Sequence, residues 1–243
     1  MAKGAAIKLI SFQESVPKLL ELLRLGDEIK KYDKIILKPF LSNSENDSTP
    51  VEFTEAVLKF CIENKNPVAD VLIAEGAEED NTLELFDERG YQRLAEKYGI
   101  GLIDLNSTET ETIENPEFLK FSTIEFPRIL SESFLISLPK IAKNEETILT
   151  ASLSNMLGAF PYSSYSGFFS KGKNKIRKWS IKYSIHDISK CKIPDFAILD
   201  ASSNSQILAG LPLEMDKQAA KILGMDWKEV PYIKLLNQSM AET

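Results

Sequence analysis

The chain has 243 residues and a formal net charge of −7, with 43% hydrophobic and 27% charged residues. This length is within the range of one α/β domain, so we expect a single domain over residues 1–243 with a sizeable core. The acidic balance argues against nucleic-acid binding by the whole surface, because duplex binding needs a basic face. No apolar run approaches the ~20 residues of a membrane span, and Met1 is not followed by a signal-peptide pattern, so we expect a cytoplasmic protein without membrane contact.

The two cysteines, Cys61 and Cys191, have no partner at metal-site spacing. Their number allows one disulfide, but free thiols in a reducing cytosol are the simpler interpretation. An iron–sulfur cluster is normally held by four cysteines, so this chain alone does not carry one. The sequence identifies no other cofactor.

Six short apolar runs predict buried parallel β-strands, because each is rich in Ile, Leu or Val and is followed by an amphipathic helical stretch. Such alternation predicts an α/β fold in which a mostly parallel sheet lies between two layers of helices. The runs are Ala5 to Phe12, Lys34 to Lys38, Val71 to Glu75, Gly101 to Asp104, Phe134 to Ser137 and Phe196 to Asp200.

Helix signals lie between these runs. Thr49 to Glu52 reads as a capping box with proline at the first helical position, which predicts a helix ending near Asn64. Four glycines follow helical patterns and are expected to be left-handed C-caps; they are Gly90, Gly99, Gly158 and Gly224.

The second half of the chain is less regular. Ser107 to Pro127 breaks the strand–helix alternation and is rich in Thr, Glu and Pro, so we expect an exposed excursion with one edge strand. Met215 to Leu223 and Pro231 to Met240 have helical spacing and predict the closing helices.

Ionisable residues follow five of the predicted strands: Lys38, Glu75, Asp104, Lys140 and Asp200. In open α/β sheets ligands bind beyond the carboxyl ends of the strands, so these side chains point to a ligand crevice at one edge of the sheet. Two lysines with several carboxylates suit a phosphate, a carboxylate or a metal ion. The alternative is that these charged side chains lie at the strand ends because the strands reach solvent at that edge. They would then only pair with one another or cap helices.

Two other features have a structural and a functional interpretation. His186 is the only histidine and adjoins Asp187 in a predicted helix, where a structural role is favoured over that of a catalytic base. Lys171 to Trp179 is the one dense basic run, flanked by Phe168 and Phe169. It fits a polyphosphate, a nucleic-acid strand or an acidic partner, although such a run is more often a solvated mobile loop. Tyr162 to Gly167, before it, reads as a flexible loop able to close over a site.

Eight motifs in a fixed order resemble the domain-of-unknown-function family numbered 362, along nearly the whole chain. No common nucleotide-binding fingerprint accompanies them. The motifs lie at Ile35 to Leu41, Ser48 to Phe60, Ala74 to Gly76, Arg89 to Asn106, Leu135 to Lys140, Ser152 to Gly158, Ile193 to Asp200 and Met215 to Gly224.

The resemblance implies relatives in redox metabolism, because many members are joined to a ferredoxin-like module that this chain lacks; it therefore points to a redox partner. This chain also departs from the family. Ala142 and Asn144 stand where relatives carry a lysine and a histidine, and Ser154 precedes Asn155 in place of a lysine. Leu211 precedes Pro212 where relatives have an aspartate.

Our first hypothesis is a small-molecule site, for an anionic ligand or a metal ion, at the carboxyl edge of the sheet, and possible enzymatic activity is left open. Lys38 and Lys140 would attract the anion, and Asn155 would orient it as a hydrogen-bond donor. Acid/base or metal-ligand oxygens would come from four carboxylates, namely Glu75, Asp187, Asp200 and Asp216.

A second hypothesis is a non-catalytic interaction protein that kept the fold while the family's site decayed. The replaced lysine and histidine positions motivate it, together with the basic run 171–179. A third and less favoured hypothesis is nucleic-acid contact through the same run.

Overall fold

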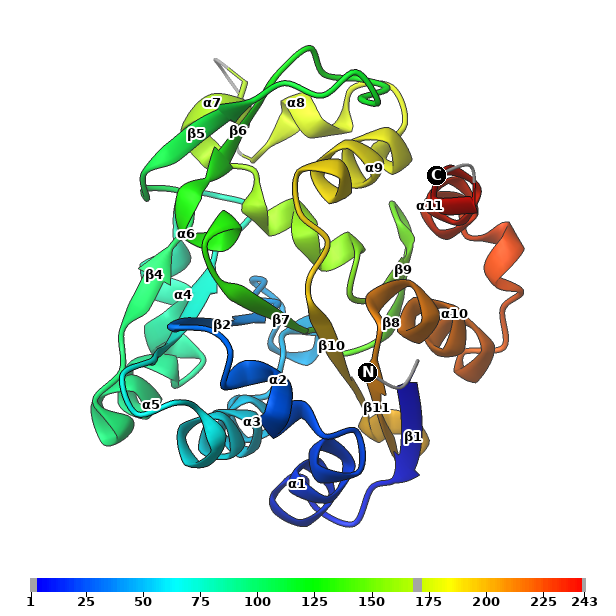
Figure 1. Ribbon diagram of the computed structural model, residues 1–243. Coiled ribbons are helices and arrows are strands. Elements are labelled where there is room, and N and C mark those ends of the chain that lie inside the picture. Colours follow the sequence, from blue (N-terminus) through cyan, green and yellow to red (C-terminus); the bar gives the residue numbers. More distant parts are fainter. Residues whose placement is uncertain (1–3, 168–171, 242–243) are drawn as a thin grey trace.

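The computed structural model describes residues 4–167 and 172–241. Its centre is a seven-stranded sheet with the strand order β1-β11-β10-β7-β2-β3-β4 (Figure 1). Only β11 runs against its neighbours, so the sheet is mostly parallel, as predicted. The strands are β1 (Gly4–Lys8), β2 (Lys34–Pro39), β3 (Asp70–Glu75), β4 (Leu102–Asp104), β7 (Phe134–Leu138), β10 (Phe196–Ala201) and β11 (Gln206–Gly210).

Side chains of one strand alternate between the two faces of the sheet, and both faces are buried. Ile35 and Leu37 of β2 belong to one core, whereas Ile36 between them belongs to another. The first core packs against α1 (Phe12–Leu22), α2 (Leu25–Ile29), α3 (Val51–Asn64), α4 (Thr82–Glu88) and α5 (Tyr91–Tyr98).

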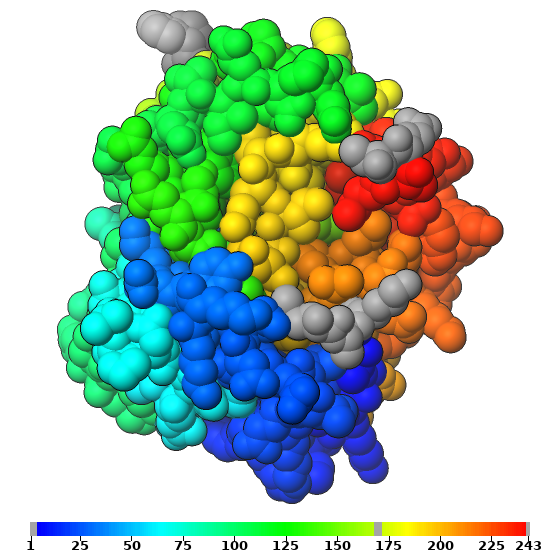
Figure 2. Space-filling view, viewed as in Figure 1, coloured from blue at the N-terminus to red at the C-terminus, as the bar shows by residue number. Residues whose placement is uncertain are grey.

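The opposite face is covered by α9 (Ile181–Cys191), α10 (Pro212–Ile222) and α11 (Pro231–Ala241). The three-layer α/β/α prediction is therefore confirmed. In the space-filling view the yellow surface around α9 lies between the N-terminal half and the red α11 (Figure 2). Among the described helices, none has both the length and the apolar character needed to cross a membrane.

Several shorter elements connect these layers. The helical turns are α6 (Arg128–Ser131), α7 (Tyr162–Tyr165), α8 (Asn174–Arg177) and the 3-10 helices η1 (Glu45–Asp47), η2 (Ser154–Ala159), η3 (Ser202–Asn204) and η4 (Trp227–Glu229). Two hairpins stand outside the main sheet, β5 (Thr110–Ile113) with β6 (Ile124–Pro127) and β8 (Ala142–Asn144) with β9 (Ile148–Thr150).

Three strand predictions need correction. The first strand ends at Lys8 and Phe12 begins α1, because the Ser11 hydroxyl accepts a hydrogen bond from the Glu14 amide and caps the helix. Residues 107–127 contain two strands that pair with each other, not one edge strand. The sequence reading missed β11, which follows β10 through a tight turn with Ser205 at φ 55°.

Two helix-end predictions are also wrong. Thr49 does not cap α3, whose N-cap is Pro50, because the Thr49 hydroxyl donates to the Leu138 carbonyl at 2.6 Å. Gly158 lies inside η2 without a positive φ, whereas the other three glycines have φ between 63° and 79°. The C-cap prediction is confirmed for Gly99.

The segment 162–167 contains a short helix where the sequence predicted a loop. Its first four residues form α7, and the Tyr165 ring is buried against Phe160 and Phe121. Of the basic run, Lys171 lies outside the described residues, as do the flanking Phe168 and Phe169. The described part of the run begins at Gly172 and includes α8.

Candidate functional site

A buried ion pair joins the ends of two adjacent parallel strands. Lys38 of β2 is fully buried, and its Nζ lies 2.7 Å from Glu75 Oε2 of β3. The same Nζ donates to the Asn155 backbone carbonyl at 2.7 Å and to its Oδ1 at 3.1 Å. Asn155 in turn donates from Nδ2 to the Lys38 carbonyl and to the Ser137 hydroxyl, both at 3.0 Å. Three of the predicted site residues, Lys38, Glu75 and Asn155, therefore form one hydrogen-bonded cluster.

Burial and ion pairing shift the pKa values of Lys38 and Glu75 in opposite directions. Burial lowers the pKa of Lys38 and raises the pKa of Glu75, while the charge of each partner opposes that change. The Gly76 amide also donates to Glu75 Oε1 at 2.9 Å, which favours the carboxylate. A buried pair of this kind is stable only while both partners are present.

Two glycines allow the backbone to approach the pair closely. A Cβ on Gly158 would lie 2.2 Å from Glu75 Oε1 and 2.6 Å from Lys38 Nζ. A Cβ on Gly76 would lie 2.3 Å from the Gly158 carbonyl oxygen. Gly158 is therefore required by close packing over the ion pair and not by a helix end.

A second lysine, Lys173, reaches the cluster from the described part of the basic run. Only 1% of its surface is exposed, and its Nζ donates to the Gly76 carbonyl at 2.9 Å and to the Gly158 carbonyl at 3.3 Å. Burial lowers the pKa of Lys173 to about 7, against the opposing charges of Glu75 and Glu78. Within residues 4–167 and 172–241 no carboxylate forms an ion pair with this ammonium group.

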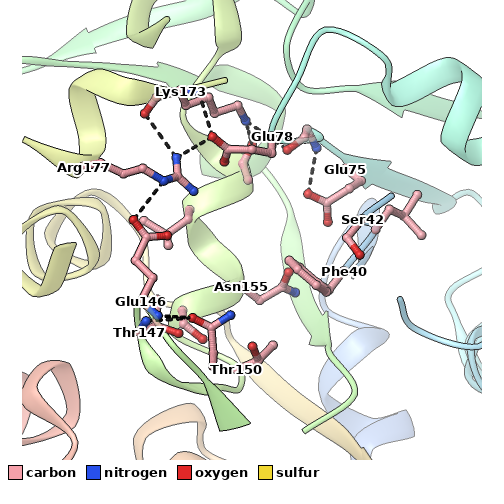
Figure 3. Close-up of a pocket in the computed structure, with 16 residues that line it drawn as sticks. Phe40, Ser42, Glu75, Glu78, Glu146, Thr147, Thr150, Asn155, Lys173 and Arg177 are labelled. Carbon is pink, nitrogen blue, oxygen red and sulfur yellow. Dashed lines mark hydrogen bonds and ion pairs between the residues drawn. The ribbon is translucent and has the colours of Figure 1, made fainter. Parts of the chain in front are cut away.

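The cluster lies beside a cavity of about 240 Å³, whose wall includes Lys173 and Glu75. Arg177 of α8 is placed between two glutamates on this wall, as Figure 3 shows. It forms an ion pair with Glu78, after β3, and its Nε lies 2.9 Å from Glu146 Oε1, in the β8–β9 turn. Three segments distant in sequence are therefore tied together around the cavity.

Lys140 and Asp200 are at the same edge of the sheet but do not line this cavity. Their backbones form an isolated parallel bridge. The Lys140 side chain turns away and donates to the Asn46 carbonyl at 2.7 Å, beside a separate depression that also includes Arg89. Asp200 is buried, and its Oδ1 accepts from the Ser202 amide at 2.8 Å. Burial raises the pKa of Asp200.

Asp187 is bound to backbone far from the cluster. Its two oxygens accept hydrogen bonds from the amides of residues 119, 120 and 121, at 2.8 to 3.0 Å. His186 is also buried, and its Nδ1 lies 2.8 Å from Asp187 Oδ1. Asp187 therefore fastens α9 to the excursion that contains β5 and β6, and His186 contacts Asp187 from the same helix.

Asp216 binds the backbone that precedes η2, the helix that carries Asn155 of the cluster. It is fully buried in α10 and accepts hydrogen bonds from the amides of Ser152 and Leu153, at 2.8 and 3.0 Å, and from the Tyr232 hydroxyl at 3.1 Å. Burial raises the pKa of Asp216 to about 7. Because Ser152 and Leu153 lead directly into η2, Asp216 positions the segment that carries Asn155.

Sequence reasoning did not place Lys173 and Arg177 at the site. The basic run was the available signal, but its density of charge favoured a solvated loop, and these two cations turn inward instead. Among the residues that the structure describes, no three His, Cys, Asp or Glu side chains are grouped as metal ligands would be.

The family model of DUF362, a domain of unknown function, matches residues 35–206. No match was found among curated proteins. The apoprotein structure of lactate racemase from Thermoanaerobacterium thermosaccharolyticum matches with a TM-score of 0.62 and 17% identity, over 94% of this chain and 58% of that chain. The likeness concerns the fold, and the chain spans little more than half of the racemase. A protein from Thermotoga maritima matches at a TM-score of 0.39 and 12% identity, over 77% of this chain and 50% of that one.

Proposed function

The chain belongs to the DUF362 family, and on that premise we propose that the cavity beside Lys173 binds a small organic anion. The observation that carries the proposal is the buried ammonium group of Lys173, which lacks a carboxylate partner among the described residues. Lys38 is paired with Glu75, and Arg177 with two glutamates, so these cations are already neutralised. A buried cation without a counter-ion is costly, and a bound carboxylate would supply that counter-ion.

The size of the cavity limits the ligand. Drug-sized ligands occupy about 300–1,000 Å³, whereas this cavity measures about 240 Å³. A metabolite of a few carbon atoms fits this space better than a nucleotide does. The similarly folded racemase is named for lactate, a 2-hydroxy acid of this size. We therefore take lactate as the first probe.

Binding of an anion should draw a proton onto Lys173. At a pH about one unit above the pKa of Lys173, the side chain is mostly neutral in the free protein. A carboxylate next to Nζ favours the charged form and raises that pKa, so each binding event takes up about one proton.

Calorimetric titration with L- and D-lactate, in two buffers with different heats of ionisation, measures both affinity and proton uptake. We expect saturable binding with uptake of close to one proton at about pH 8. Lys173→Met should abolish the uptake, whereas Lys175→Met, which removes an exposed lysine of the same helix α8, should leave it unchanged. Binding that is equal in wild type and Lys173→Met would place the anion elsewhere, and the absence of binding by either enantiomer would count against the proposal.

The interaction-protein hypothesis predicts a plugged crevice, because a decayed site is no longer kept open for a ligand. The charged cavity beside Lys173 favours the ligand site instead. The metal form of the first hypothesis is not carried forward, since the described residues offer no grouped metal ligands.

A further inference from the structure

The hydrogen bonds of the Lys173 amine are compatible with its neutral form. Among the described residues, two carbonyl oxygens accept hydrogen bonds from this side chain, those of Gly76 and Gly158. A neutral amine has two N–H donors and one lone pair, whereas an ammonium group has three donors and no lone pair. The two carbonyls therefore satisfy every donor of the neutral amine and leave its lone pair uncommitted.

The surroundings of this amine are also those of a reactive lysine. It lies on the wall of a cavity and forms no ion pair with a carboxylate of the described residues, in contrast to the ion-paired Lys38. Desolvated lysines without a counter-ion are the ones that act as nucleophiles toward carbonyl compounds.

A titratable group is fixed beside the amine through one shared residue. Glu75 Oε1 accepts the Gly76 amide, and Lys173 Nζ donates to the Gly76 carbonyl. Burial raises the pKa of Glu75. A carboxyl group at this position stands where dehydration of an amine adduct requires proton transfer.

We propose that Lys173 forms an imine with a small 2-oxo acid bound in the cavity. This inference rests on the proposed anion site and names the substrate class of that site. The amine nitrogen adds to the C2 carbonyl carbon and gives a carbinolamine; the C–O bond then breaks, and the oxygen leaves as water with two protons. A C=N bond replaces the C=O bond, and no oxidant or reductant is needed. Both protons of the water come from the neutral amine, and one further proton from solvent gives the protonated imine, whose positive charge lies on the nitrogen next to the carboxylate of the ligand.

Reductive trapping tests this step. The full chain is incubated near neutral pH with pyruvate and cyanoborohydride, which reduces an imine to a stable secondary amine, and the modified lysines are identified by peptide mass spectrometry. We expect Lys173 to be modified at least about tenfold faster than exposed lysines such as Lys175, because burial lowers the pKa of Lys173 to about 7 and leaves much of it as the nucleophilic neutral amine. Lactate, which has the same size but no carbonyl, should slow the modification by competition and form no adduct.

The outcomes separate the two proposals. Suppose that pyruvate and lactate bind in calorimetry but the adducts are spread evenly over exposed lysines, or no adduct forms. That result would overturn the imine proposal and leave the anion-site proposal intact. Absence of both binding and adduct would overturn both. Because the modified residue is located in the wild-type chain, the test does not depend on the folding of a variant. Lys173→Met adds a second measurement and should lose the fast phase, whereas Lys175→Met should keep it.

Discussion

Replacement of Lys173 by methionine should change how the stability of the protein depends on pH. Methionine keeps the length and apolar stem of lysine but does not titrate. The folded-state pKa of Lys173, about 7, lies below the usual 10.5 because of burial. A lowered pKa means that the unfolded chain binds the proton more tightly than the folded one. The contribution of Lys173 to stability is therefore greatest above the unfolded pKa and falls as the pH is lowered toward about 7.

The size of the effect follows from the two pKa values. Each tenfold difference in proton affinity is worth about 1.4 kcal/mol, so a fall from 10.5 to about 7 corresponds to about 5 kcal/mol over the whole range. Between about pH 7 and about pH 9.5, where most proteins are still easy to handle, the unfolding free energy of wild type should rise by about 3 kcal/mol relative to Lys173→Met. The loss of two hydrogen bonds in the variant is the same at every pH and cancels in this comparison.

Urea unfolding of both proteins at several pH values gives the difference directly. Other buried groups, such as the Tyr91 hydroxyl, are common to both chains and cancel as well. Lys175→Met is the matched control, because it removes an exposed lysine two positions away in sequence. A difference between wild type and Lys173→Met that is flat with pH would refute the reasoning, since it would mean that folding does not alter the proton affinity of Lys173.

Three further variants test the cluster and its support. Glu75→Gln leaves Lys38 buried without a counter-ion and should cost about 3–5 kcal/mol in urea unfolding; adding Lys38→Met should recover part of that loss, and a Glu75→Gln protein as stable as wild type would argue against an ion pair. Gly158→Ala places a Cβ 2.2 Å from Glu75 Oε1 and should cost about 1–3 kcal/mol, seen as a lower Tm; an unchanged Tm would show that η2 shifts freely. Asp216→Asn should be less stable than wild type because an amide nitrogen cannot accept the backbone hydrogen bonds. Because burial raises the pKa of Asp216 to about 7, the unfolding free energy of wild type falls as the pH rises toward that value. The difference in unfolding free energy between wild type and Asp216→Asn should therefore narrow by about 2–3 kcal/mol from about pH 5 to about pH 8 in chemical denaturation. A difference that stays constant with pH would contradict a raised pKa.

The sequence by itself determined the layered fold and the position of most strands. Buried parallel strands are short, continuous apolar runs, so their periodicity is a local signal that needs no knowledge of the partner strands. Lys38 and Glu75 were found for the same reason. Both stand at the ends of such runs, and β2 and β3 are adjacent parallel strands whose carboxyl ends lie at the same edge of the sheet, where the two side chains meet.

Which other residues line the candidate site depends on the tertiary packing and could not be predicted from the sequence. Lys140 follows a strand end in the same pattern, yet its side chain turns to the Asn46 carbonyl. Lys173 reaches the Gly76 carbonyl from 97 positions away in sequence, out of a segment whose composition favours solvent. Its inward course depends on α8 packing against neighbouring elements and on the pairing of Arg177 with two glutamates. The charge density of a sequence shows how polar a segment is. Only the packing of the folded chain determines which of its charged side chains are desolvated and therefore have shifted pKa values.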